Sequence, residues 1–136
     1  MQASAPSERD EPQYVDIVVI DDDQLTLDLL RGKLRRVGAA VCCFEDCEEA
    51  LAYLSDHDVP VLLVDHRMPG VSGIEFLEQL HLLGNMPPTV FLASAIELPA
   101  DVAIAAERLG VHFLSKDYYR DAAGLCALIS QHQQSE

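Results

Sequence analysis

Short apolar runs rich in β-branched residues alternate along the chain with segments in which apolar residues recur every three or four positions. A β-branched run of this length is typical of a buried strand, and the longer spacing is typical of an amphipathic helix. Five such runs predict strands at residues 15–20, 40–44, 61–64, 89–93 and 111–114. Helical spacing follows each run, so the pattern predicts strict alternation of strand and helix.

Residues at the predicted helix ends support these boundaries. Ser72 is followed by Glu75, and Asp46 by Glu49, which is the spacing of a capping box. Gly110 stands where the helix before the last strand would end. The helix-ending residues therefore agree with the apolar pattern.

The predicted strands are apolar enough to be covered on both faces. Together with the alternation, this favours an α/β fold with a parallel sheet, helices on both faces and right-handed crossovers. A length of 136 residues suits one domain, which we place at residues 14–131. Residues 1–13 are polar and predict a flexible tail. Residues 132–136 are expected to be a tail or linker stub.

Composition and charge exclude several classes of protein. The net charge of −14 argues against direct nucleic-acid binding, which usually needs clustered Lys and Arg. No apolar run approaches the ~20 residues of a membrane span, and the start has no signal-peptide pattern, so we expect a cytoplasmic protein without membrane contact. The four cysteines lack zinc-site spacing and are expected to be buried, reduced thiols.

Candidate chemistry gathers where predicted strands end. Asp21 and Asp22 follow the first strand, Asp65 the third, Ser94 the fourth and Lys116 the fifth. The carboxyl ends of parallel strands meet at one edge of a sheet, where ligands bind. Converging carboxylates repel one another, and hard oxygen ligands suit Mg²⁺. A carboxylate beside Mg²⁺ can attack an incoming phosphorus atom, so the pattern indicates formation of an aspartyl phosphate.

The chain resembles the receiver domains of two-component response regulators over almost all of residues 14–129. The resemblance is carried by short motifs at the ends of predicted strands, namely Val18 to Asp22, Asp65-His66-Arg67-Met68-Pro69 with Gly73, Ser94-Ala95, and Lys116. It implies a flavodoxin-like, doubly wound (βα)5 fold with strand order 2-1-3-4-5.

The function that the resemblance implies is a phosphorylation-dependent signalling switch. The phosphoryl group would come from a sensor histidine kinase or a histidine phosphotransfer protein. The altered surface would act on a downstream protein target or a fused output domain, and a homodimer is left open. Such a domain is not a turnover enzyme, although it catalyses its own phosphoryl transfer and slow dephosphorylation.

The resemblance also assigns the acidic residues. Asp65 would be the phosphoacceptor and a Mg²⁺ ligand. Asp22 would bind the metal directly, Asp21 would support it through water, and the backbone carbonyl of Arg67 would complete the protein ligands.

The remaining assignments concern the phosphoryl group and the switch. Ser94 would donate a hydrogen bond to one phosphoryl oxygen, and Lys116 would pair with another. Phe113 matches the switch aromatic, whose rotamer changes as the hydroxyl residue moves. The alternative for Phe113 is an ordinary buried core aromatic.

Two departures from the family pattern bear on these assignments. Receiver domains usually follow the active-site Lys with Pro, whereas Asp117 follows Lys116 here, so we expect a trans bond. The positions two residues after the phosphoacceptor and after the hydroxyl hold Arg67 and Ile96. Neither is an acid or amide that would orient water, which predicts a long-lived phosphoryl group.

Other interpretations remain open from sequence alone. Asp23 is explained by the N-terminus of the first helix, whose dipole favours a carboxylate. A degenerate receiver would keep the fold as an unphosphorylated interaction module. A haloacid-dehalogenase-type phosphatase would need Asp-x-Asp-x-Thr, which Gln24 and Leu25 interrupt.

Overall fold

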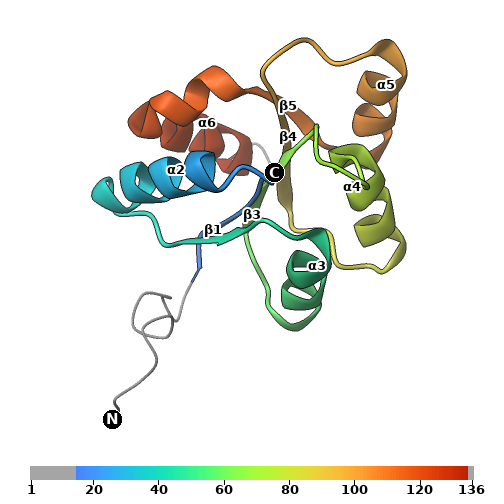
Figure 1. Ribbon diagram of the computed structural model, residues 1–136, viewed down its shortest axis with the longest axis horizontal. Coiled ribbons are helices and arrows are strands. Elements are labelled where there is room, and N and C mark those ends of the chain that lie inside the picture. The colour runs from blue at the N-terminus through green and yellow to red at the C-terminus, as the bar shows by residue number, and fades with distance from the viewer. Residues whose placement is uncertain (1–14, 135–136) are drawn as a thin grey trace.

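One parallel sheet organises the molecule, and a computed structural model describes residues 15–134 of it. The strands are β1 (Ile17–Ile20), β2 (Val41–Phe44), β3 (Val61–Asp65), β4 (Thr89–Ser94) and β5 (His112–Ser115). They lie side by side in the order β2-β1-β3-β4-β5 (Figure 1). This confirms the predicted fold class and strand order.

Helices cover both faces of the sheet (Figure 1). They are α2 (Gln24–Arg36), α3 (Cys47–Asp56), α4 (Gly73–Leu82), α5 (Ala100–Leu109), the 3-10 helix η1 (Lys116–Arg120) and α6 (Ala122–Gln134). Helices α2 and α6 pack on one face, while α3, α4 and α5 pack on the other. The sheet is therefore the middle of three layers.

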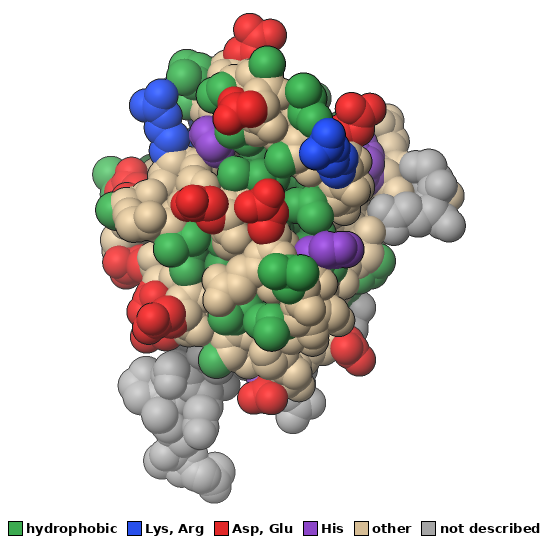
Figure 2. Space-filling view, turned by 90° about the vertical axis from the view of Figure 1, so that its right-hand side faces the viewer, with side chains coloured by type: hydrophobic (Ala, Val, Ile, Leu, Met, Phe, Trp, Pro, Cys, Tyr) green, Lys and Arg blue, Asp and Glu red, His purple; other side chains and the backbone are tan. Residues whose placement is uncertain are grey.

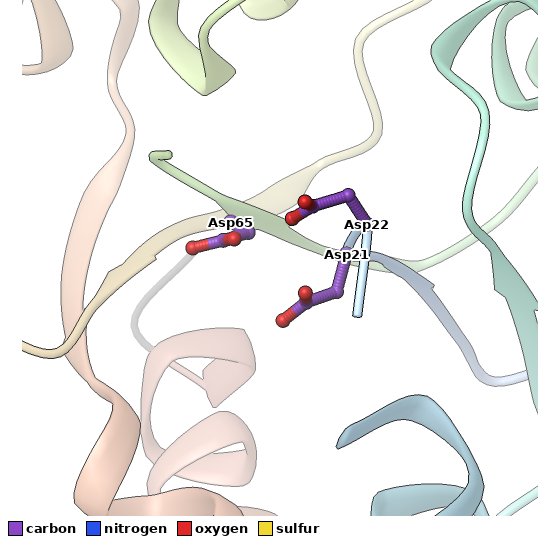
Figure 3. A group of neighbouring side chains, drawn as sticks. All are labelled: Asp21, Asp22 and Asp65. Carbon is purple, nitrogen blue, oxygen red and sulfur yellow. The ribbon is translucent and has the colours of Figure 1, made fainter. Parts of the chain in front are cut away.

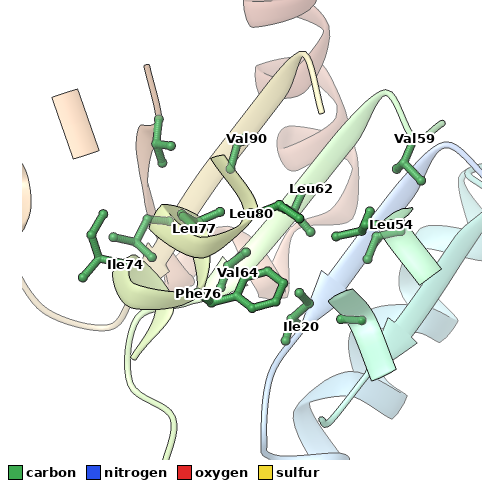
Figure 4. Packing of buried hydrophobic residues seen from close by; sticks show 14 of the residues in the cluster. Ile20, Leu54, Val59, Leu62, Val64, Ile74, Phe76, Leu77, Leu80 and Val90 are labelled. Atoms are coloured by element: carbon green, nitrogen blue, oxygen red, sulfur yellow. The ribbon is translucent and has the colours of Figure 1, made fainter. Parts of the chain in front are cut away.

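Successive strand residues point to opposite faces, which explains the continuous apolar runs in the sequence. Within β1, Val18 and Ile20 belong to the core under α3, α4 and α5, whereas Ile17 and Val19 belong to the core under α2 and α6. Figure 4 shows the first of these cores, where Phe76 packs against the sheet. Because both faces are covered, neither set of side chains meets water.

The helix starts follow the predicted capping residues, with one difference. Ser72 and Glu75 form the expected capping box at the start of α4. Asp46 does cap α3, but its carboxylate accepts from the amide of Glu48 at 2.9 Å and not from that of Glu49. Asp23 accepts from the amide of Leu25 at 3.2 Å, which supports its assignment to the start of α2.

The C-terminal part of the chain differs from the expectation in two ways. Helix α6 continues to Gln134, three residues beyond the predicted domain end at residue 131. Its His132 lies 4.2 Å from His112 of β5 between ring centroids, so the last turn packs against the sheet. Helix η1 was not predicted. The predicted tail at residues 1–13 and the last residues, 135–136, lie outside the described residues.

The four cysteines are free thiols, but each is half-buried, so the expected full burial is wrong. Burial raises the pKa of Cys43, Cys47 and Cys126 above the ordinary value. Within residues 15–134, every helix is too short or too polar to cross a membrane.

Candidate functional site

The carboxyl edge of the sheet brings the predicted site residues to three adjacent strands and one edge strand. Asp65 is the last residue of β3, which lies between β1 and β4. Asp21 and Asp22 follow β1, Ser94 ends β4, and Lys116 follows β5. Strand order thus places Asp65 at the centre of the group.

The three carboxylates converge on one small space. Oxygen atoms of Asp21, Asp22 and Asp65 all lie within 4.8 Å of one another. Figure 3 shows the three side chains approaching this space from β1 and β3. Asp21 is 1% exposed and Asp65 is 5% exposed, whereas Asp22 is exposed to solvent. Such a set of oxygen donors, open to water on one side, fits a hard cation such as Mg²⁺.

Lys116 reaches across the sheet edge to two of these carboxylates. Its Nζ lies 2.8 Å from Oδ2 of Asp21 and 3.2 Å from Oδ1 of Asp65. Burial by itself would lower the pKa of Lys116, but the hydrogen bonds and negative charges of Asp21 and Asp65 outweigh it and raise that pKa. The side chain is therefore a charged ammonium group that forms ion pairs with both carboxylates.

The electrostatic environment of Asp65 disfavours its charged form. Burial raises the pKa of Asp65, and the negative charge of Asp21 raises it further. Lys116 and the amide of Arg67, which donates to Oδ1 of Asp65 at 3.4 Å, partly offset this rise. Three carboxylates and one ammonium leave the site with uncompensated negative charge, which a cation would neutralise.

Ser94 lies beside Asp65 at the end of the neighbouring strand. In the β3–β4 register Asp65 is opposite Ala93, so Ser94 stands one residue further toward the edge. Its side chain is buried, and its Oγ accepts a hydrogen bond from the amide of Ile96 at 3.2 Å. The side chains of Arg67 and Ile96 are both exposed to water.

The loop after Asp65 closes against the strand through Gly73. The amide of Gly73 donates to the carbonyl of His66 at 3.0 Å. A Cβ at position 73 would overlap the backbone carbonyl of Asp65 and lie 2.7 Å from Cδ1 of Leu92. Glycine is therefore the residue that allows α4 to start directly beside the phosphoacceptor candidate.

Phe113 lies apart from the carboxylates, on edge strand β5. It is paired with Leu92 in the β4–β5 register and is 48% exposed. The alternative interpretation, a buried core aromatic, is wrong because nearly half of Phe113 is exposed to water. The described residues contain no cis peptide bond, which confirms the predicted trans bond between Lys116 and Asp117.

Tyr119 is a site residue that sequence reasoning missed. Its ring lies under Lys116, with 5.5 Å between Nζ and the ring centroid. Burial raises the pKa of Tyr119 well above the ordinary value, and the charges of Asp21 and Asp65 add to this rise. The signal in the sequence is the three-residue spacing between Lys116 and Tyr119. This spacing indicates a contact only once the 3-10 helix η1 is known, because that helix has three residues per turn.

Known proteins share both the sequence pattern and the fold. The model of the response regulator receiver domain family matches residues 17–129. The response regulator protein TodT of Pseudomonas putida is 31% identical over 103 residues, which is 75% of this chain and 44% of that protein. The transcriptional regulatory protein FixJ of Bradyrhizobium diazoefficiens is 33% identical over 106 residues, 77% of this chain and 51% of that protein.

The chain thus spans about half the length of these relatives. Among solved structures, a CheY-like receiver domain protein from Methanospirillum hungatei superposes with a TM-score of 0.74 at 20% identity, covering 91% of this chain and all of that one. This likeness supports the flavodoxin-like fold. Because the family match covers most of the chain, the protein belongs to the response regulator receiver domain family, whose members act in phosphorylation-dependent two-component signalling.

Proposed function

We propose that Asp65 accepts a phosphoryl group from the phosphohistidine of a sensor histidine kinase or a histidine phosphotransfer protein. The phosphorylated domain then presents an altered surface to a downstream protein or to an output domain of the same protein. The observation that carries the proposal is the position of Asp65, buried beside Asp21 and bonded to the ammonium of Lys116 at 3.2 Å.

Transfer to Asp65 exchanges one bond to phosphorus for another. An Oδ atom of Asp65 forms the new O–P bond while the P–N bond to the donor imidazole breaks, and its electron pair leaves with the imidazole nitrogen. Lys116 is placed to pair with one phosphoryl oxygen, and the hydroxyl of Ser94 to donate to another. Later attack of water on the acyl phosphate returns the Asp65 carboxylate and inorganic phosphate.

The site fits Mg²⁺ by its donor set and its charge. Asp21, Asp22 and Asp65 would hold the ion together with the backbone carbonyl of Arg67, Asp21 acting through water. Bound there, the ion would neutralise charge on the phosphoryl oxygens. Asp22 is exposed, so it leaves room for the water molecules that Mg²⁺ retains.

The switch in our proposal links Ser94 to Phe113. To reach a phosphoryl oxygen, Oγ of Ser94 leaves the amide of Ile96, which shifts the end of β4. Phe113 lies on the next strand and is 48% exposed, so its ring can turn inward as Ser94 moves. This changes the surface formed by α5 and β5.

That surface already has features of a contact face. Ile104 lies on α5 and is 50% exposed. Ile96 lies in the loop between β4 and α5 and is 56% exposed. Figure 2, which views the side of α4 and α5, shows apolar side chains exposed between scattered acidic ones. We propose that the downstream partner binds here.

Intact mass spectrometry after incubation with Mg²⁺ and acetyl phosphate tests the phosphoacceptor. We expect one phosphate adduct that requires Mg²⁺ and is absent from Asp65→Asn. Asp101→Asn removes an exposed carboxylate in the first turn of α5 and serves as the matched control, which should be labelled like the native chain. Absence of an adduct with both acetyl phosphate and phosphoramidate would refute the proposal and favour a degenerate receiver.

A further inference from the structure

The chain after β5 is built differently from the Lys-Pro sequence that receiver domains usually have. The amide of Asp117 donates to Oγ of Ser115 at 3.2 Å, and this bond caps the start of η1. Proline has no N–H group and would leave Ser115 without this donor. The residue that replaces proline therefore starts the 3-10 turn.

The geometry of this turn explains why a ring lies under the ammonium group. A 3-10 helix has three residues per turn, so side chains at positions i and i+3 eclipse one another. Lys116 and Tyr119 have this spacing, and Nζ of Lys116 lies 5.5 Å from the ring centroid. The pair is a direct product of η1.

The ring is a fixed support because it is anchored in the core. Tyr119 is 8% exposed and belongs to the same apolar cluster as Leu27 of α2 and Ala122 of α6. By contrast, the Lys116 side chain is 23% exposed and has a flexible four-carbon stem. The ring thus adds a contact from the core to the two carboxylates that already hold the Lys116 ammonium.

We propose that Tyr119 is a positioning residue for phosphoryl transfer, which holds the Lys116 ammonium against the phosphoacceptor. This inference rests on the proposed function. The ammonium lies 2.8 Å from Asp21 and 3.2 Å from Asp65, and the ring attracts it as a cation–π partner. A cation that is in place before the phosphoryl group arrives does not have to be repositioned during transfer. Preorganisation of this kind accelerates a reaction because it removes that cost from the barrier.

Three variants separate positioning from simple core packing. Tyr119→Leu removes the ring and should slow phosphorylation by acetyl phosphate about tenfold at saturating Mg²⁺, as expected from the loss of a preorganised contact. Tyr119→Phe keeps the ring, removes a buried hydroxyl that has no hydrogen-bond partner among the described residues, and should stay within about twofold of the native rate. Tyr118→Leu changes the neighbouring half-buried tyrosine and is the matched control, with an unchanged rate.

Two further measurements distinguish this role from a general structural one. Mg²⁺ affinity, measured by calorimetry, should be the same in all three variants because the carboxylates remain. In NMR spectra the methylene protons next to Nζ of Lys116 should show the upfield shift caused by an aromatic ring. That shift should persist in Tyr119→Phe and disappear in Tyr119→Leu. If Tyr119→Leu does not fold, Tyr119→Met supplies a flexible apolar side chain of similar reach for the same tests.

The outcomes are distinct for the two proposals. A native chain that is phosphorylated, with Tyr119→Leu or Tyr119→Met equally fast, overturns the positioning role and leaves the proposed function intact. A slow Tyr119→Phe overturns it as well, because the ring would not be sufficient. If the native chain takes no phosphoryl group, the proposed function and this inference fall together.

Discussion

Replacing Lys116 with methionine should destabilise the fold, because the Lys116 ammonium offsets the repulsion between the carboxylates of Asp21 and Asp65. Methionine keeps an apolar stem of similar length, so the main loss is the ammonium shared by Asp21 and Asp65. Breaking a buried ion pair costs about 3–5 kcal/mol, but the Lys116 side chain is 23% exposed. We therefore expect the free energy of unfolding to fall by about 2 kcal/mol near neutral pH. At a slope of about 1.5 kcal/mol/M, the urea midpoint falls by about 1.3 M.

The pH dependence of this loss has a defined sign. Lys116 at present offsets part of the rise in the pKa of Asp65, so its removal raises that pKa further in the folded state. A carboxyl group with a raised folded-state pKa destabilises the fold above that pKa, and the destabilisation disappears as the pH falls through it. The stability deficit of Lys116→Met should therefore be smaller at a mildly acidic pH of about 5 than at about pH 7.5.

Urea titrations at these two pH values, with and without Mg²⁺, provide the assay. Mg²⁺ should stabilise Lys116→Met more than the native chain, because the variant site has one more uncompensated negative charge. Arg36→Met removes an exposed positive charge from the last turn of α2 and controls for the loss of a positive charge. A deficit that is the same at both pH values and unaffected by Mg²⁺ would refute the reasoning.

Three other outcomes follow from the site. Asp65→Asn should raise the free energy of unfolding by about 1 kcal/mol in urea titrations, because it removes a repelled buried charge; a lower midpoint would contradict this. Gly73→Ala should lower stability by about 2 kcal/mol, whereas Gly32→Ala, where a Cβ meets open space in α2, should raise it by about 0.5–1 kcal/mol. The phosphoryl group on the native chain should persist well beyond seconds in a mass-spectrometric time course, and an acid or amide at Arg67 or Ile96 should shorten its lifetime.

The sheet and the acidic edge could be predicted because they depend on local pattern and simple topology. The buried strands required continuous apolar runs, so β1, β3 and β4 were visible in the sequence. Once the strands are parallel, residues after them meet at one edge, which brings Asp21, Asp65 and Lys116 together without further information. The capping pair Ser72 and Glu75 likewise acts within one turn.

The features that were missed depend on tertiary contacts. Helix η1 is a short turn whose start needs the Ser115 hydroxyl, and its sequence has no apolar period. The end of α6 depends on His132 packing against a strand twenty residues earlier in the chain. The exposure of Phe113 depends on β5 being an edge strand, which the residue type alone cannot indicate. Topology brings Lys116 near Asp21 and Asp65, but their ion pairs could not be predicted because they depend on side-chain positions.

The contact between Lys116 and Asp21 joins residues 95 positions apart. Closing such a long loop has an entropic cost that must be met before the contact can form, so native sites of this kind depend on long-range assembly. A nascent chain that has emerged only as far as β4 contains Asp65 but lacks the Lys116 ammonium that pairs with it. The proposed phosphorylation site is therefore complete only after the last strand has been added, because Lys116 follows β5.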